Sequence, residues 1–192
     1  MSPGLAAAAT VARVPVLRHT ARARRLDPEQ LSRHLDRLFR AAWAICGDPH
    51  EAEDLVQETC ARVLARPRWL RHGDDLGYLL QVLRNTHVSG LRRARARPSE
   101  VPLDQDAELG AATSAADPVG AFEAGELFAA ISALPQPARE AIVAVDVMGM
   151  SYREAAAALR VKEATVTTRL HRARRRVVDS LTSEPEHART GS

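Results

Sequence analysis

The side chains best suited to hydrogen-bonding chemistry lie near the C-terminus, between Ser151 and Arg176. This segment holds eight basic residues against Glu154 and Glu163, so its net charge is +6. A polyanion responds to the local field within about 8–10 Å rather than to the charge of the whole chain. Glutamate can accept a hydrogen bond from cytosine, and arginine can bind guanine through two hydrogen bonds. The segment therefore indicates recognition of nucleic acid.

The elements that must position these side chains form a helix-turn-helix. Ser151 and Glu154 have the spacing of a capping box, which starts a short helix through Leu159. Residues 160–163 form a turn, and a longer helix over 164–178 follows, with Val166, Leu170, Ala173 and Val177 facing inward. The second helix of this motif enters the major groove. Its expected base-reading residues are Lys162, Glu163, Thr165, Thr167, Thr168 and Arg169.

Arginines farther along the same helix are expected to neutralise phosphates: Arg172, Arg174, Arg175 and Arg176. About four such contacts would give a slope of log affinity against log salt of roughly −3 to −4. The alternative for this run alone is a solvated helix end favoured by the helix dipole. The capping box, the turn and the apolar spacing together favour DNA binding.

Helical periodicity also begins near Asp27, where an N-cap precedes Pro28 and continues to Ile45. A second helix is expected over 50–65 and a third from Asp75 or Leu76 to about Ala96. The aromatic share is only 4%, which favours helices over sheet. We expect an all-α protein with almost no sheet.

Charge and composition divide the chain. Residues 98–126 hold seven acids and no base, a net charge of −7, and helical spacing is lost over 98–117. Helical spacing resumes at 119–134 and 138–147. We expect two small helical domains joined by a flexible acidic linker. The expected parts are a disordered basic extension over 1–26, a helical domain over 27–97, the linker over 98–118, the helix-turn-helix domain over 119–182 and a disordered tail over 183–192.

No cofactor or metal site is expected. Cys46 and His50 straddle a helix end, and no second pair completes a tetrahedral site. Two cysteines cannot form a disulfide framework, and no signal peptide or membrane-length apolar run is present, so a cytoplasmic protein is expected. Residues 1–25 superficially resemble a transit peptide but are interpreted as a disordered extension.

Two segments resemble the extracytoplasmic-function (ECF) sigma factors of bacterial RNA polymerase. The C-terminal match to region four rests on Leu134, Pro135, Arg139, residues 149–156 and residues 165–174. The match to region two rests on residues 47–49, 52–58 and 78–93. The sequence departs from the family pattern at five positions. In the C-terminal match, Arg160 replaces the turn glycine and Lys162 replaces a hydroxyl-bearing or acidic residue. In the other match, Tyr78 replaces tryptophan, Gln81 a basic residue and Ser89 an acidic one.

This resemblance implies a partner and two DNA contacts. The C-terminal domain would read the −35 element through the residues named above, with Arg172 and Arg176 on phosphates. Docking on the clamp helices of the large polymerase subunit would use Asp54, Leu55, Gln57 and Glu58. The −10 element would be read and held by Arg84, Asn85, Ser89, Arg92, Arg93 and Trp69. Trp69 could stack on a flipped base, or it could be buried. An anti-sigma factor is a further expected partner.

Two other classes of protein share parts of this sequence pattern. A helix-turn-helix repressor or activator that needs no polymerase would bind duplex DNA alone, as a dimer on a palindrome. A magnesium nuclease would use Asp48, Glu51, Glu53 and Asp54, but no basic phosphate clamp converges on these carboxylates. The sequence therefore favours a promoter-specificity subunit without enzymatic activity, small-molecule substrate or membrane insertion.

Overall fold

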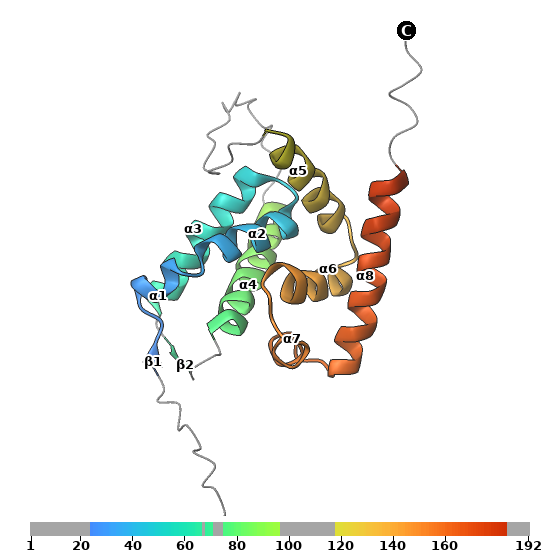
Figure 1. Cartoon of the computed structure of the whole chain (residues 1–192). Helices are drawn as coiled ribbons and strands as arrows, with labels where there is room; N and C mark the ends of the chain where they lie inside the picture. Colours follow the sequence, from blue (N-terminus) through green and yellow to red (C-terminus); the bar gives the residue numbers. More distant parts are fainter. Residues whose placement is uncertain (1–23, 67, 71–74, 97–117, 184–192) are drawn as a thin grey trace, which may run out of the picture.

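The computed structural model describes residues 24–66, 68–70, 75–96 and 118–183 of the 192-residue chain (Figure 1). The expected linker and both expected disordered tails lie largely outside these residues. The all-α fold class is confirmed. The elements are β1 (Arg24–Arg25), α1 (Pro28–Ser32), α2 (Leu35–Cys46), α3 (Pro49–Ala65), β2 (Trp69–Leu70), α4 (Asp75–Ala96), α5 (Pro118–Ser132), α6 (Gln136–Ile142), the π-helical turn η1 (Val143–Val147), α7 (Tyr152–Leu159) and α8 (Glu163–Ser183).

Side-chain caps start several of these helices, at Asp27 as the sequence predicts and at Asp48, which was not predicted as a cap. The Asp27 carboxylate accepts a hydrogen bond from the Gln30 amide at 2.8 Å, and Asp48 accepts one from the Glu51 amide at 2.9 Å. In both helices a proline follows the cap, where its missing N–H costs nothing. These local signals set where the helices begin.

The predicted first helix is wrong in one respect, because it is two helices. The His34 amide donates to the Leu31 carbonyl at 2.9 Å, three residues back instead of four, and α2 restarts at Leu35. Apolar spacing continues across this break, so the sequence pattern could not reveal it. Leu35 consequently points outward and is 41% exposed.

A short strand pair joins the end of the N-terminal extension to the loop before α4. Arg24 pairs with Leu70 and Arg25 with Trp69 in antiparallel register. Leu26 and Leu70 are buried beside this pair. Leu26 was predicted to lie in a disordered extension, because two-residue strands are too short to show an alternating pattern.

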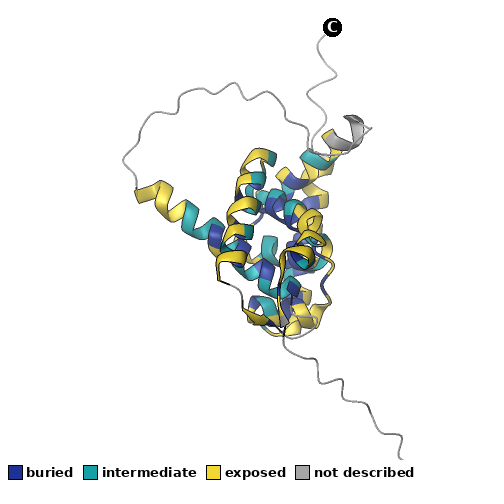
Figure 2. Ribbon diagram, turned by 90° about the vertical axis from the view of Figure 1, so that its left-hand side faces the viewer, coloured by how far each residue is buried: buried dark blue, intermediate teal, exposed yellow. Residues whose placement is uncertain are grey.

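One hydrophobic core runs through the N-terminal helices (α1–α4) and the C-terminal helices (α5–α8). Helix α2 lies at its centre, in contact with α3, α4, α5 and η1. Ala41, Ala42 and Ala44 of α2 are fully buried, and their small side chains permit close helix approach. Buried positions accordingly gather along the inward faces of the helices (Figure 2). The two expected domains are therefore docked on each other.

The helix-turn-helix start offers a test of local stability. The Ser151 hydroxyl accepts from the Glu154 amide at 3.3 Å, and the Glu154 carboxylate accepts from the Ser151 amide at 2.8 Å. Ser151→Ala should lower the free energy of unfolding by about 1 kcal/mol, measured by urea denaturation.

Hydrogen bonds from Ser151 lower the pKa of Glu154. The contribution of the Glu154 carboxylate to the free energy of unfolding should therefore be fully present above the pKa that it has in the unfolded chain. It should be lost as the pH falls through the lower pKa of the folded protein.

Ser180→Ala on the exposed part of α8 is the matched control, because it removes a hydroxyl that caps no helix. An equal loss of stability in the two variants would contradict the capping interpretation.

Candidate nucleic-acid interface

The turn between α7 and α8 has a left-handed residue at Arg160, with φ 55° and ψ 45°. The Val161 amide donates to the Ala156 carbonyl at 3.0 Å and the Arg160 amide to the Ala157 carbonyl at 3.3 Å. This is the Schellman arrangement, in which glycine usually takes the left-handed position. A side chain there costs about 1–2 kcal/mol. Because both hydrogen bonds are present, the turn keeps its geometry although arginine replaces glycine at position 160.

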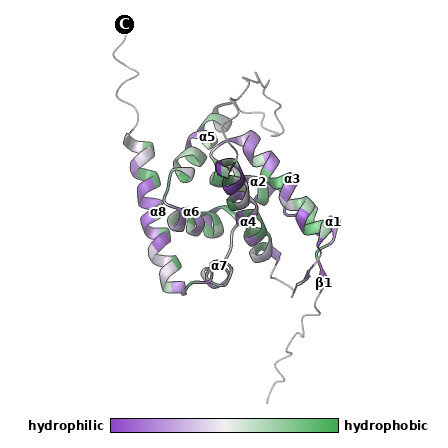
Figure 3. Cartoon of the chain, turned by 180° about the vertical axis from the view of Figure 1, so that it is seen from behind, coloured by the Kyte–Doolittle hydropathy of each residue, from purple (hydrophilic) through white to green (hydrophobic). Residues whose placement is uncertain are grey.

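Helix α8 presents a polar outer face. The predicted inward residues Val166, Leu170, Ala173 and Val177 are buried, as expected. Figure 3 shows hydrophilic residues along much of the remaining surface of this helix. Of the predicted DNA-reading residues, Thr165 and Arg169 are half-buried, and the exposed ones are Lys162, Glu163, Thr167, Thr168, Arg172 and Arg176.

The hydroxyl groups of two threonines on this face donate hydrogen bonds to backbone carbonyls of the same helix. The Thr167 hydroxyl donates to the Glu163 carbonyl at 3.1 Å, and the Thr168 hydroxyl donates to the Ala164 carbonyl at 2.9 Å. Each oxygen keeps free lone pairs. In this state both side chains are suited to accept hydrogen bonds from a partner, such as a base amino group.

Arg174 differs from its neighbours because it is held within the protein. Its Nε donates to Asp146 Oδ2 at 2.9 Å and its Nη2 donates to Asp146 Oδ1 at 2.6 Å. The hydrogen bonds from Arg174 to Asp146 raise the pKa of the guanidinium. This ion pair ties α8 to η1 and so positions the helix, while a contact of Arg174 with phosphate stays a prediction.

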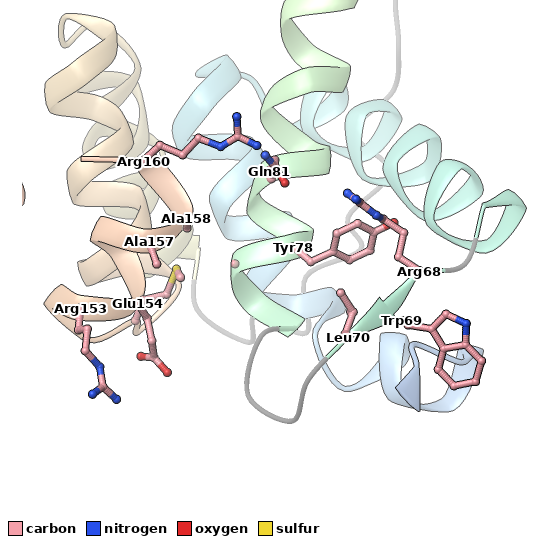
Figure 4. Close-up of a pocket in the computed structure, with 12 residues that line it drawn as sticks. Arg68, Trp69, Leu70, Tyr78, Gln81, Arg153, Glu154, Ala157, Ala158 and Arg160 are labelled. Carbon is pink, nitrogen blue, oxygen red and sulfur yellow. The ribbon is translucent and has the colours of Figure 1, made fainter. Parts of the chain in front are cut away.

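Trp69 is exposed rather than buried, with 66% of its surface accessible. The guanidinium carbon of Arg25 lies 5.0 Å from the centre of its ring, within the range of a cation–π contact. The strand pair holds this tryptophan at the edge of the fold, and Figure 4 shows its ring directed away from Tyr78. The geometry favours the stacking interpretation over the buried one.

The predicted −10 residues of α4 do not form one free surface. Asn85, Arg92 and Arg93 are exposed and Ser89 is half-buried, and the last turns of the helix are exposed throughout (Figure 2). Arg84 instead forms an ion pair with Glu140 of α6, with its Nη2 at 2.6 Å from Oε1. No local sequence signal points to this contact, because the two residues are 56 positions apart.

Three further arginines lie outside the predicted DNA-reading set but come together in the fold. Arg68, Arg153 and Arg160 line a groove of about 620 Å³ between α4 and α7, together with Trp69 (Figure 4). Arg153 and Arg160 belong to the basic segment 151–176, whereas Arg68 lies far from it in the sequence and no charge run marks it. Arg160 extends toward Gln81 of α4 in this view.

Helix α3 carries the predicted acidic face. Asp54, Gln57 and Glu58 are exposed, and Glu58 pairs with Arg62 at 2.8 Å. Leu55 is only 8% exposed, so in this conformation it belongs to the core rather than to a free surface. The polar part of the predicted set is thus available to a partner.

Cysteine and histidine side chains form no metal cluster in the part of the chain that the structure describes. Burial, followed by the charge of Glu51, raises the pKa of Cys46 to about 12. His87 of α4 is half-buried; burial and then Arg139 lower its pKa. Within the described ranges, the helices are too short or too polar to cross a membrane.

Comparison with protein families adds to this geometry. A profile described as Sigma-70 region 2 matches residues 31–97, and one described as Sigma-70, region 4 matches residues 124–177. The ECF RNA polymerase sigma factor SigE of Mycolicibacterium smegmatis is 35% identical over 164 residues, which cover 80% of this chain and 60% of SigE. EcfG of Rhodopseudomonas palustris, also an ECF RNA polymerase sigma factor, is 35% identical over 69% of this chain and 72% of its own length.

Two solved structures share the fold. The sigma factor RpoE of Bartonella quintana, solved with the anti-sigma factor NepR, matches 82% of this chain and 97% of its own with a TM-score of 0.58 and 25% identity. CnrH, solved with the cytosolic domain of CnrY, matches 82% of this chain and 88% of its own with a TM-score of 0.54 and 22% identity.

The difference between Arg172 and Arg174 can be measured by salt titration. Arg172→Ala should reduce the slope of log affinity against log salt by about 0.9, the value of one phosphate contact. Arg174→Ala should change the slope less, because Asp146 already neutralises that guanidinium. Fluorescence anisotropy on a duplex selected from a random library measures both. Equal reductions in slope would contradict the assignment of Arg174 to positioning.

Proposed function

Because the chain belongs to the ECF sigma factors of bacterial RNA polymerase, we propose that it binds core RNA polymerase and directs initiation at promoters with −10 and −35 elements. The observation that carries this proposal is the exposed polar face of α8 behind an intact helix-turn-helix turn. A second helical unit accompanies it in the same chain. The C-terminal helices (α5–α8) would bind duplex DNA sequence-specifically, and the N-terminal helices (α1–α4) would dock on the polymerase.

The −35 element is read by α8 in the major groove. Lys162, Glu163, Thr167 and Thr168 lie in or just before its first two turns, the part of a recognition helix that meets base edges. Arg172 and Arg176 lie farther along and neutralise phosphates, which adds affinity without sequence information. The ion pair between Arg174 and Asp146 keeps the helix in register with the rest of the unit.

The −10 element is bound by α4 and the segment before it. Trp69 offers an exposed aromatic face, and aromatic side chains stack on unpaired bases of any sequence. Asn85 supplies hydrogen bonds, and Arg92 and Arg93 hold the backbone of the strand. This division lets one unit read duplex DNA while the other holds a melted strand.

Core polymerase docks on α3. Asp54, Gln57 and Glu58 project from the side of this helix that does not enter the core. An acidic face of this kind attracts a basic protein surface and repels DNA. We infer that the chain acts by binding, in the cytoplasm, and performs no reaction of its own.

An anti-sigma factor is the proposed regulator. RpoE of Bartonella quintana was solved with the anti-sigma factor NepR, and CnrH was solved with the cytosolic domain of CnrY. By analogy, such a partner would grip the helical faces of one or both units of this chain and prevent polymerase binding.

Promoter-directed transcription with purified core polymerase tests the proposal. The wild-type chain should give transcripts from a subset of promoters in a genomic library. Asp54→Arg should weaken core binding about tenfold or more, because it reverses charge at the proposed contact, while binding of a −35 duplex is unchanged. Glu123→Arg, an exposed charge reversal on α5, is the matched control. Tight palindrome binding without polymerase, and no transcript from any promoter, would favour a polymerase-independent regulator.

Trp69 should contribute to strand separation and not to duplex binding. Loss of one stacked base costs about 1–3 kcal/mol, so Trp69→Ala should reduce open-complex formation about 5- to 150-fold. Permanganate footprinting measures the melted bases. Trp69→Phe keeps a stacking surface and should retain most of the activity. If Trp69→Ala weakens binding of a −35 duplex equally, the assignment of Trp69 to the melted strand is wrong.

A further inference from the structure

The strand pair at the edge of the fold contains a contact that the proposed promoter interface does not yet use. Arg25 of β1 lies directly opposite Trp69 of β2 in the antiparallel pair, so the two side chains share one face. The guanidinium carbon of Arg25 lies 5.0 Å from the centre of the Trp69 ring. A guanidinium at this distance is attracted by the face of an indole. Arg25 therefore holds the Trp69 ring in place.

Burial of two leucines explains why so short a strand pair forms. Strands of two residues are too weak to persist by themselves in water. Leu26, directly after β1, is 3% exposed, and Leu70 of β2 is 9% exposed. Asp27 then starts α1 by accepting a hydrogen bond from the Gln30 amide. The position of Arg25 is thus fixed by the core and by the helix that follows, and not by its surface contact alone.

Positive charge gathers beside this ring. Arg25 is exposed, and so are Arg66 and Arg68, which precede Trp69 in the chain. Arg68 also lines the groove next to Trp69 (Figure 4). Residues 1–25 hold five arginines and no acidic residue. A single-stranded nucleic acid offers both partners that such a surface needs, phosphates for the guanidinium groups and bases for the ring.

One face of the Trp69 ring stays available to a base. The Arg25 guanidinium lies over the ring, yet 66% of Trp69 is exposed. Figure 4 shows the ring directed away from Tyr78. A base on the free face would complete a stack of guanidinium, indole and base. The guanidinium keeps N–H donors along its edge, and these match the oxygens of a phosphate.

Arg25 lies outside the segments that the family profiles match, because the Sigma-70 region 2 profile begins at residue 31. We propose that Arg25 is a positioning and strand-binding residue: it holds the Trp69 ring ready for a base of the melted −10 strand and binds a phosphate of the same strand. This inference rests on the proposed function, because it extends the −10 surface to the segment before α1. The two roles differ in salt dependence, since phosphate contacts weaken with salt and stacking does not.

Binding of a single strand to the full-length chain tests these roles without polymerase. The probe is a short oligothymidylate, because stacking on an aromatic ring accepts every base. Wild-type protein should bind it with quenching of Trp69 fluorescence. Arg25→Gln should weaken binding about two- to fivefold at high salt, the effect of one exposed cation–π contact. It should also reduce the slope of log affinity against log salt by about 0.7.

Three variants serve as controls. Arg37→Gln removes an exposed arginine of α2 with the same change of charge, and it should leave the quenching and the high-salt affinity unchanged. Arg25→Lys keeps the charge and should restore the salt slope, although it lacks the planar stacking group. Trp69→Phe leaves only the fluorescence of the half-buried Trp43 and so identifies the signal of Trp69.

Three results would overturn the proposal. The first is oligothymidylate binding by the wild-type chain without quenching of Trp69. The second is an equal loss of affinity and slope in Arg25→Gln and Arg37→Gln. The third is binding to vesicles of phosphatidylglycerol and phosphatidylcholine that depends on Arg25, with no binding to oligothymidylate. That result would assign the basic surface to an anionic membrane.

A second measurement uses core polymerase and a promoter that is transcribed with the wild-type chain. Arg25→Gln should reduce the permanganate reactivity of the melted bases about two- to fivefold, while binding of a −35 duplex is unchanged. Unchanged reactivity would overturn the role of Arg25. If the wild-type chain yields no transcript from any promoter, the proposed function fails, while the oligothymidylate measurement still decides whether Arg25 and Trp69 bind a single strand.

Discussion

Close approach of helices to α2 is the constraint on which this fold depends. Ala41, Ala42 and Ala44 are fully buried, so neighbouring backbones come nearer than larger side chains would allow. Alanine also loses no side-chain entropy on burial. Elements from both halves of the chain, α3 and α4 on one side and α5 and η1 on the other, reach this one helix. A single core thus replaces the two separate cores that the linker suggests.

Features of the fold with local causes could be predicted from the sequence. Asp27 and Ser151 accept amide protons at the helix starts that they mark, and the inward residues of α8 recur with helical period. The helix-turn-helix and its exposed polar face follow from these signals. Breaks within apolar runs escaped prediction, at His34 and at η1, because the pattern of apolar residues hardly changes there.

Contacts between distant positions could not be predicted, and they change the meaning of several site residues. Arg84 and Arg174 belong to the same class of exposed helical arginine in sequence, yet each has a carboxylate partner 56 or 28 positions away. Leu55 likewise shares a helix with exposed acids but faces the core. The groove arginines come together only through folding. Residue type and spacing thus predicted the binding helices, and only packing showed which of their side chains already have partners within the protein.

The short strand pair also determines where the chain enters the folded body. Because Arg25 is paired with Trp69, everything before Arg24 departs from beside the exposed aromatic face. The end of α8 lies on a different side of the molecule, away from β1 and β2 (Figure 1). The chain therefore enters the folded body beside the proposed strand-binding surface and leaves α8 at a place remote from it.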